Sequence, residues 1–205
     1  MAWICNNDEK SAAIWDMIAK PCSNYPRRSP YADEFLQRSG IEPGDTVFDM
    51  GCGTGTLCLP LADDGHRVFC GDYSEKTLQM VQDTIEEEGI ELITLRKMSF
   101  LEDWDRLDIP VCDYAFASRS LFEVDPYIVI PKLSAYAKKK VCITVHVNFT
   151  DHTVSGFEVK GNEMREYFKA CINAVIDAGY MPHVDYMTFG TCHENNGWAF
   201  ISWSV

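Results

Sequence analysis

Apolar residues recur along the chain in two alternating patterns, short β-rich runs and longer stretches with helical spacing. The β-rich runs lie at 46–50, 67–70, 92–95, 111–117 and 141–147. Between most of these runs, apolar side chains recur three and four positions apart, which places them on one face of a helix. Strands that alternate with helices in this way predict a mostly parallel sheet with helices on both of its faces.

Two of the predicted helices also carry signals at their ends. Ser29 is suited to cap a helix whose first residue is Pro30, and Gly40 closes that helix. Ser74 is suited to cap another helix, and Gly89 stops it. Further helices are predicted over 8–20, 54–62, 127–137 and 163–178.

Two segments interrupt the regular alternation. The helix predicted over 54–62 contains Pro60, and we expect this proline to break or kink the helix near its end because it removes an N–H donor. Residues 148–162 are polar and contain glycine, and we expect them to form a loop.

The last part of the chain predicts a pair of closing strands. β-rich runs at 184–189 and 198–203 flank an Asn-Gly pair, which is a strong turn signal. The expected fold is therefore a doubly wound, mostly parallel seven-stranded sheet with a terminal antiparallel hairpin. We expect a single domain, in which helices of residues 1–42 form a lid over an α/β core of residues 43–205.

Charge narrows the kind of partner that the protein accepts. The chain has 205 residues, of which 46% are hydrophobic and 24% are charged, as in ordinary globular domains. Eighteen basic against 31 acidic residues give a net charge of −13. Such a chain repels nucleic acid and anionic membranes, and its only basic clusters are short, Arg27-Arg28 and 138–140. A small-molecule partner is therefore easier to reconcile with this charge than RNA, DNA or a membrane.

Cysteine usage points to a reducing compartment. The chain has nine cysteines, an odd number, and none of them form a C-x-x-C pair. The first residues lack a basic leader, so we expect no signal peptide. No apolar stretch approaches the roughly 20 residues of a membrane span. We therefore expect a cytoplasmic protein with free thiols. The run 192–194, Cys-His-Glu, lacks further ligands at a recognised spacing, so no metal site is expected.

The glycine-rich segment 49–55 carries the clearest chemical signal. It follows the first β-rich run directly and reads Asp-Met-Gly-Cys-Gly-Thr-Gly. Glycines let the backbone turn sharply and let a ligand approach closely, and the following helix offers free N–H groups. Asp72 ends the second β-rich run, so in a doubly wound sheet it faces the same crevice. Its carboxylate can accept hydrogen bonds from two ribose hydroxyls, which predicts a nucleoside-containing ligand.

A nicotinamide-dependent oxidoreductase is the competing interpretation. Dinucleotide-binding turns have the spacing G-x-G-x-x-G. Here the third glycine, Gly55, comes one residue early, and Thr56 occupies the position that requires glycine or alanine. Asp49 also lies where a pyrophosphate would be repelled by its charge. These departures count against a dinucleotide.

The segment resembles the first motif of the class I S-adenosylmethionine-dependent methyltransferases, [D/E]-x-G-x-G-x-G. Asp49 and the three glycines of 49–55 match every fixed position, and 71–74, Gly-Asp-Tyr-Ser, fits the second motif at the end of strand two. The resemblance covers about residues 45–147. It implies S-adenosylmethionine as cofactor and transfer of its methyl group to a small acceptor, and a cofactor-binding module without catalysis stays an alternative.

The resemblance also implies roles for individual residues. The glycine backbone is expected to pack against the methionine and ribose of the cofactor, Asp49 to reach the methionine amino group, and Tyr73 to lie against adenine. Ser99 replaces an aspartate that is common in the adenine loop. The expected cofactor-binding residues are Asp49, Gly51, Cys52, Gly53, Thr54, Gly55, Asp72, Tyr73, Ser99, Phe100 and Ser118.

Acceptor and catalytic residues are less strongly indicated. Tyr25, Arg28 and Tyr31 cluster before the first strand, where they either close over the cofactor and acceptor or form an ordinary surface loop. Arg119 follows the fourth strand beside the expected acceptor. His146 ends the fifth strand and is either a general base or a structural residue. The sequence leaves the acceptor atom and the oligomeric state open.

Overall fold

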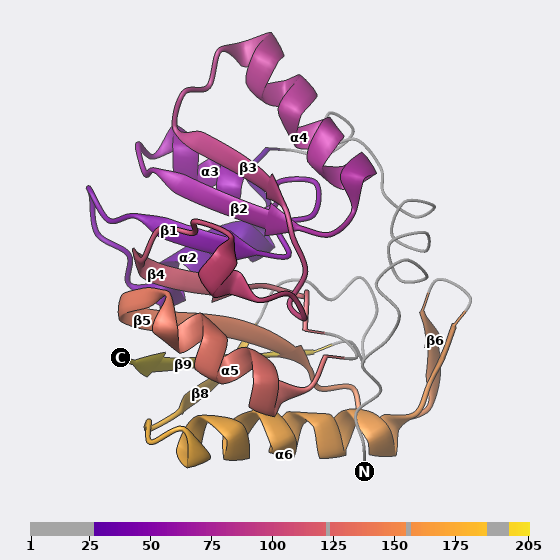
Figure 1. Ribbon diagram of the computed structural model, residues 1–205. Coiled ribbons are helices and arrows are strands. Elements are labelled where there is room, and N and C mark those ends of the chain that lie inside the picture. The colour runs from indigo at the N-terminus through magenta and orange to yellow at the C-terminus, as the bar shows by residue number, and fades with distance from the viewer. Residues whose placement is uncertain (1–26, 122–123, 155–156, 188–196) are drawn as a thin grey trace.

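A computed structural model of the protein describes residues 27–121, 124–154, 157–187 and 197–205 (Figure 1). Its larger sheet has seven strands in the order β3-β2-β1-β4-β5-β9-β8. Pairing is parallel from β3 to β5, whereas β9 runs antiparallel to both β5 and β8. The strands are β1 (Val47–Met50), β2 (Val68–Asp72), β3 (Ile93–Lys97), β4 (Cys112–Ala117), β5 (Ala137–His146), β8 (His183–Met187) and β9 (Trp198–Ser204). The predicted doubly wound sheet with its terminal antiparallel pair is confirmed.

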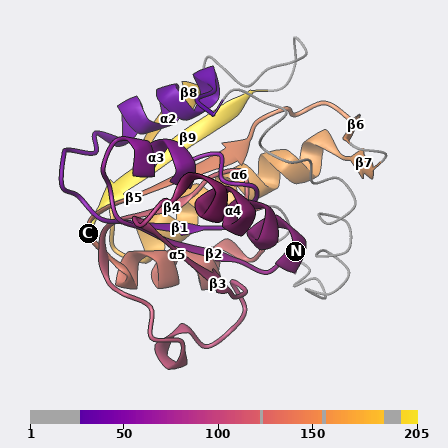
Figure 2. The same cartoon turned by 90° about the horizontal axis from the view of Figure 1, so that it is seen from above.

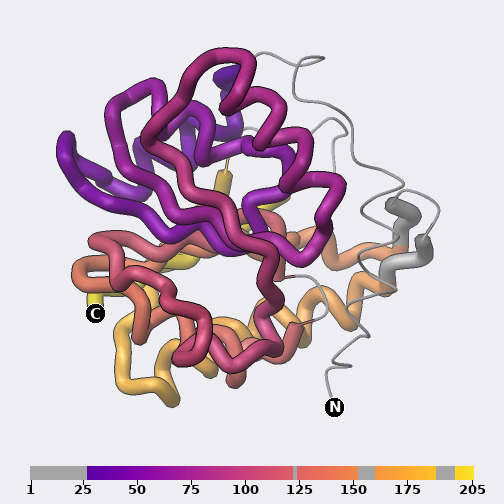
Figure 3. Tube along the Cα trace, turned by 45° about the horizontal axis from the view of Figure 1, so that its top comes forward, coloured from indigo at the N-terminus to yellow at the C-terminus, as the bar shows by residue number. Residues whose placement is uncertain are grey.

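Helices cover both faces of this sheet. They are α2 (Pro30–Ser39), α3 (Cys58–Asp63), α4 (Glu75–Glu88), α5 (Pro126–Ala135) and α6 (Gly161–Asp177), with a short 3-10 helix at Trp104–Arg106. α5 and α6 lie side by side and share one apolar core with the sheet, while α2, α3 and α4 share the other (Figures 1 and 2). The described segments from α3 to β3 and from α5 to α6 occupy adjacent halves of the molecule (Figure 3). They meet where β1 pairs with β4, which is the switch point of the strand order.

The predicted helix caps are confirmed at α2 and α4. The Ser29 side chain accepts a hydrogen bond from the N–H of Ala32, Pro30 is the first residue of α2, and Gly40 ends the helix with φ +69°. Ser74 caps α4 through the N–H of Thr77. These ends follow from local chemistry, because each cap satisfies an N–H group that the first helical turn leaves free.

The prediction for the helix at 54–62 was wrong at its start. α3 begins at Cys58, so Pro60 lies in its first turn, where the missing N–H has no helical partner to lose. The proline therefore causes no break. The residues between β1 and α3 form a long turn instead of a helical start, which leaves the whole glycine segment available to shape a site.

Two further boundaries differ from the predictions. β5 begins at Ala137, inside the predicted end of the preceding helix, because α5 already ends at Ala135. The expected loop at 148–162 contains a second, two-stranded antiparallel sheet of β6 (His152–Val154) and β7 (Phe157–Val159). The Asn-Gly turn expected before β9 lies largely outside the described residues.

The described part of the predicted lid packs as a core helix. In α2, Phe35 is fully buried and its ring meets those of Phe116 and Phe200 edge-on at 5.1 and 5.2 Å. Ala32 is also fully buried. α2 therefore extends the apolar core across the sheet, and only the helix predicted at 8–20, outside the described residues, keeps the lid interpretation. Within the described ranges, no helix has both the length and the apolarity that a bilayer span requires.

Candidate functional site

The turn after β1 lies at the carboxyl edge of the sheet, beside the switch point. The N–H groups of Gly51 and Cys52 both donate to the carbonyl of Gly71, at 2.7 and 3.2 Å, which ties the turn to β2. Gly51, Gly53 and Gly55 have φ values of +76°, +54° and +96°. Because side chains strain this region of backbone conformation, the turn requires glycine at these positions.

The three glycines differ in what a side chain would meet. A Cβ on Gly51 would lie 2.2 Å from Cβ of Ser120, and one on Gly55 would lie 2.7 Å from a methyl carbon of Leu59. A Cβ on Gly53 would meet none of the described heavy atoms within 4 Å. Gly51 and Gly55 therefore serve close packing, whereas Gly53 presents bare backbone to open space, as a ligand-binding position requires.

Asp72 holds this turn in place. One carboxylate oxygen accepts a 2.8 Å hydrogen bond from the N–H of Gly53, and the other accepts a 2.9 Å bond from the N–H of Ser74. The residue is 6% exposed, and burial raises the pKa of its carboxyl while these N–H donors oppose the rise. Each oxygen has a further lone pair, so Asp72 can still accept hydrogen bonds from a ligand. Tyr73, next in the chain, is half-buried at the same edge.

Asp49 is the most unusual charged group in the site. It is 2% exposed, and its Oδ2 has no hydrogen-bond partner among the described residues. Burial, and then the neighbouring Asp72, raise the pKa of Asp49 to about 7. An unpartnered carboxylate in such surroundings is costly, so the position suits a cationic or hydrogen-bond-donating partner.

Ser99 and Phe100, the predicted cofactor-binding residues in the loop after β3, are both buried. Phe100 is 4% exposed, and its ring lies 6.1 Å from that of Trp104 within the apolar core. The Ser99 hydroxyl accepts from the N–H of Leu101, and its carbonyl accepts from Nε1 of Trp104. The structure therefore uses Phe100 in the core and Ser99 to shape the turn. Within the glycine turn, Thr54 is half-buried and Cys52 is 5% exposed.

A second wall of the site joins α2 to the ends of β4 and β5. The Tyr31 hydroxyl lies 2.6 Å from the hydroxyl of Ser118 and 3.0 Å from that of Thr144. The Arg119 guanidinium carbon lies 3.9 Å from the centre of the Tyr31 ring, which is a cation–π contact. Arg119 itself has φ +55°. Of the residues predicted to bind the methyl acceptor, the structure thus brings Tyr31 and Arg119 together beside Ser118.

The hydrogen bonds of this wall form a continuous series. The Thr144 hydroxyl accepts from the N–H of Arg119 at 2.9 Å and shares a further hydrogen bond with the Tyr31 hydroxyl. Tyr31 in turn shares a hydrogen bond with Ser118, the half-buried end of the series. In both bonds between hydroxyls, either group can be the donor. Ser118 therefore brings a hydroxyl group to the site.

The other residues predicted to bind the methyl acceptor, and the predicted general base, are not described at this wall. Arg28 makes a two-point contact with Asp64, both bonds 2.7 Å long, and a further 2.9 Å bond to Asp33. Its charge is therefore used to tie the start of α2 to the end of α3, and the structure does not bring it to the wall around Tyr31. Tyr25 lies outside the described residues. His146 ends β5, half-buried, with its ring 5.1 Å from that of Trp198.

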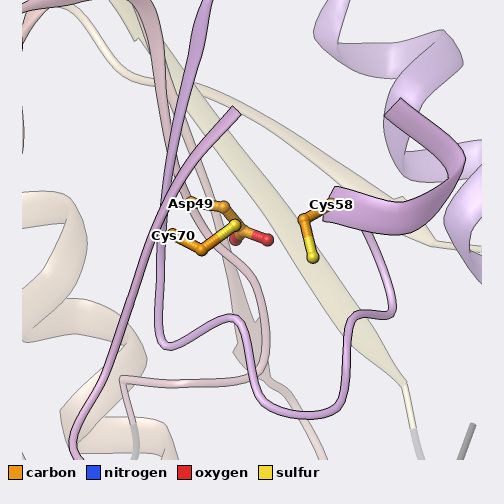
Figure 4. A group of neighbouring side chains, drawn as sticks. All are labelled: Asp49, Cys58 and Cys70. Atoms are coloured by element: carbon orange, nitrogen blue, oxygen red, sulfur yellow. The ribbon is translucent and has the colours of Figure 1, made fainter. Parts of the chain in front are cut away.

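The structure also gathers a group that the sequence did not reveal. Asp49, Cys58 and Cys70 come from β1, α3 and β2, and their carboxylate oxygen and sulfur atoms all lie within 4.8 Å of one another (Figure 4). The three residues follow no spacing pattern, because sheet pairing and the return of the chain into α3 bring them together. Only their position around the glycine turn could have indicated them.

Comparisons with known proteins agree with this geometry. Residues 47–129 match the family model for a methyltransferase domain. An uncharacterized protein of Haemophilus influenzae is 34% identical over 163 residues, which are 78% of this chain and 59% of that protein. The chain thus spans less than two thirds of this relative's length.

Solved structures match over nearly the whole chain. The 4+2 cyclase SpnF has a TM-score of 0.72 at 15% identity, with 97% of both chains covered. The geranyl diphosphate C-methyltransferase of Streptomyces coelicolor A3(2), crystallised with Mg²⁺, geranyl diphosphate and S-adenosyl-L-homocysteine, has a TM-score of 0.67 at 13% identity. It covers 100% of this chain and 98% of its own. At these identities the likeness establishes the fold.

Proposed function

The chain carries a domain of the class I S-adenosylmethionine-dependent methyltransferase family, and on this premise we propose that it transfers a methyl group from S-adenosylmethionine to a small-molecule acceptor. The observation that carries the proposal is the pairing of two features at the carboxyl edge of the sheet. Gly53 presents open backbone, and Asp49 holds a buried carboxylate oxygen without a described partner.

The donors and acceptors of the site fit this cofactor. The free Oδ2 of Asp49 suits the positively charged amino group of the methionine part, and such a partner would offset the cost of the buried charge. The remaining lone pairs of Asp72 suit the two ribose hydroxyls. Open space at Gly53 lets the cofactor lie against the backbone. When bound, S-adenosylmethionine supplies a methyl group that its positively charged sulfur already makes electrophilic.

The protein's own contribution is positioning. Since the reacting methyl carbon needs an acceptor atom held close and in line, the wall of Tyr31, Ser118 and Thr144 limits where that acceptor can lie. Ser118 offers the acceptor a hydroxyl group. Arg119 brings a positive charge to this wall, which suits an acceptor that carries a carboxylate or phosphate. His146 stays the proposed general base for an acceptor that must lose a proton.

The charge of the chain and its structural neighbours support a small acceptor. A net charge of −13 disfavours nucleic acid. The Streptomyces coelicolor neighbour holds geranyl diphosphate, a small molecule, in that protein. A cytoplasmic location is part of the proposal, because six described cysteines are free and buried thiols suit reducing surroundings.

Calorimetric titration tests the proposal. Purified protein is titrated with S-adenosylmethionine and, separately, with NADH, and both titrations are repeated with Asp72→Ala. The matched control is Glu75→Ala, which lies three residues away and removes an exposed carboxylate paired with Lys97. Saturable binding of S-adenosylmethionine that Asp72→Ala weakens at least about tenfold and Glu75→Ala preserves supports the proposal.

A second step separates binding from turnover. Protein that binds the cofactor is incubated with methyl-labelled S-adenosylmethionine and a panel of small carboxylates, phosphates and neutral amines. Label transferred to a compound by the wild type, and lost with Asp72→Ala, supports catalysis. Binding of NADH in place of S-adenosylmethionine overturns the assignment, and cofactor binding without transfer to any compound favours a non-catalytic module.

A further inference from the structure

Three buried side chains converge beside the glycine turn in a way that cofactor binding does not explain. Asp49 is 2% exposed, and Cys58 and Cys70 are fully buried. The Asp49 carboxylate points between the two sulfur atoms, with Cys58 approaching from the start of α3 and Cys70 from β2 (Figure 4). One carboxylate oxygen and two sulfur atoms thus surround a single point, all within 4.8 Å of one another.

The chemistry of this set is that of a metal-binding site. Thiolate sulfur and carboxylate oxygen are both ligands of Zn²⁺, and sulfur selects such ions over Mg²⁺ and Ca²⁺. The carboxylate oxygen Oδ2 of Asp49 has no hydrogen-bond partner among the described residues, so it is available to a ligand. Zn–S bonds of about 2.3 Å in a tetrahedron place two sulfur atoms about 3.8 Å apart. The observed separations, none above 4.8 Å, need a closure of at most about 1 Å between the two sulfur atoms and slightly more between sulfur and oxygen.

We propose that Asp49, Cys58 and Cys70 bind a thiophilic divalent metal ion such as Zn²⁺. On binding, the Cys58 and Cys70 thiols each form a bond to the metal and release one proton to solvent, and no electron is transferred. The ion's two positive charges are then met by two thiolates and one carboxylate. Three protein ligands leave the fourth position of a tetrahedron for a further ligand.

Metal binding is coupled to the loss of protons from the buried thiols. Burial raises the pKa of Cys70 well above its usual value, as do the neighbouring thiols of Cys52 and Cys58. A buried cysteine without metal packs as a small apolar group. A metal ion reverses this, because a coordinating thiol loses its proton outright.

One consequence rests on the proposed function. If Asp49 binds the cofactor's amino group, metal and cofactor need the same carboxylate and compete for the protein. Metal binding itself does not depend on that role. A protein that binds metal but no S-adenosylmethionine would retain this inference and lose the proposed function, and the reverse result would do the opposite.

Cadmium titration tests the site, because Cd²⁺ bound to thiolates absorbs in the ultraviolet. The full chain, freed of metal with a chelator and kept reduced, is titrated with Cd²⁺ and then challenged with Zn²⁺. The test variant is Cys58→Ser/Cys70→Ser. The matched control is Cys142→Ser/Cys171→Ser, which removes two other fully buried thiols and leaves the cluster intact. Circular dichroism establishes that each variant is folded.

Wild type and control are expected to bind one equivalent of Cd²⁺ with a two-thiolate absorption that Zn²⁺ displaces. The Cys58→Ser/Cys70→Ser protein should lose this absorption. Asp49→Asn keeps both thiols and the side-chain shape, so it should bind at least about tenfold more weakly and serves if the double variant does not fold. Absence of a stoichiometric signal in wild type, or an undiminished signal in folded Cys58→Ser/Cys70→Ser or Asp49→Asn protein, overturns the proposal.

Discussion

Oδ2 of Asp72 accepts a 2.8 Å hydrogen bond from the N–H of Gly53, so the carboxylate that ends β2 holds the turn that leaves β1. Asp72, which is predicted to bind the ribose, therefore also stabilises the glycine turn. This double role means that changes at Asp72 act on cofactor binding in two ways, through a lost acceptor and through a looser turn.

Replacement of Asp72 by alanine should weaken binding of S-adenosylhomocysteine by about 10- to 100-fold, since a hydrogen bond to a charged group contributes about 1.5–3 kcal/mol. The variant also leaves the N–H groups of Gly53 and Ser74 without their acceptor. Isothermal titration calorimetry measures the change, with Glu75→Ala as the control. Equal affinity of Asp72→Ala and wild type would contradict the assigned role.

The raised pKa of Asp49 predicts a pH effect on stability. Its carboxyl has a pKa of about 7 in the folded protein against an ordinary value of 3.8, so the folded state binds the proton more tightly between these values. The free energy of unfolding should then fall as pH rises from about 4 to about 7. Asp49→Asn cannot ionise and should lose about 2–4 kcal/mol less over this range than wild type.

Urea unfolding of both proteins at several pH values, with a chelator present to remove metal, measures this difference. Glu75→Ala is again the control, because it removes a carboxylate that is exposed. Parallel pH profiles for wild type and Asp49→Asn would show that Asp49 ionises normally.

The two glycines at 51 and 53 should respond differently to alanine. Gly51→Ala places Cβ against Ser120 at a positive φ, so it should cost more than about 2 kcal/mol of stability. Gly53→Ala meets open space and should cost only about 1–2 kcal/mol through its backbone conformation. Because that open space is the proposed cofactor position, Gly53→Ala should nevertheless weaken S-adenosylhomocysteine binding.

Thermal unfolding and calorimetry on the two variants separate these effects. Ser120→Gly should restore part of the stability of Gly51→Ala, since it removes the clashing Cβ and leaves only the strained backbone. Failure of this rescue, together with equal costs at both glycines, would contradict the packing explanation.

Tyr31→Phe should keep the ring against Arg119 but lose the hydroxyl that joins Ser118 to Thr144. We expect a loss of about 1–2 kcal/mol, because Ser118 and the buried Thr144 then lose the hydroxyl with which both share a hydrogen bond. Urea unfolding measures it, with Tyr127→Phe, whose residue is 46% exposed, as the control. In a double-mutant cycle, Thr144→Val should add less to Tyr31→Phe than it costs alone, and simple additivity would argue against the contact.

Elements that depend on neighbouring residues were predictable from the sequence alone. The caps at Ser29 and Ser74 and the glycine turn follow from short-range hydrogen bonds and backbone sterics. The order of strands and helices follows from apolar periodicity, which local windows contain. Where two local signals competed, as at Pro60, the sequence misplaced the helix start, because proline is tolerated in a first turn and excluded from an interior.

Contacts between distant segments were decided only by the tertiary structure. Tyr31 meets Ser118 and Thr144 across 87 and 113 positions of sequence because α2 packs on the sheet beside the ends of β4 and β5. Asp49, Cys58 and Cys70 meet because parallel pairing sets β2 beside β1 and the chain returns into α3. The fold class and the turn at which a nucleoside ligand is expected could be predicted from the sequence, since both arise locally. The acceptor wall and the buried thiol–carboxylate group depended on packing, because no local pattern records which side chains a folded core brings within a few ångströms.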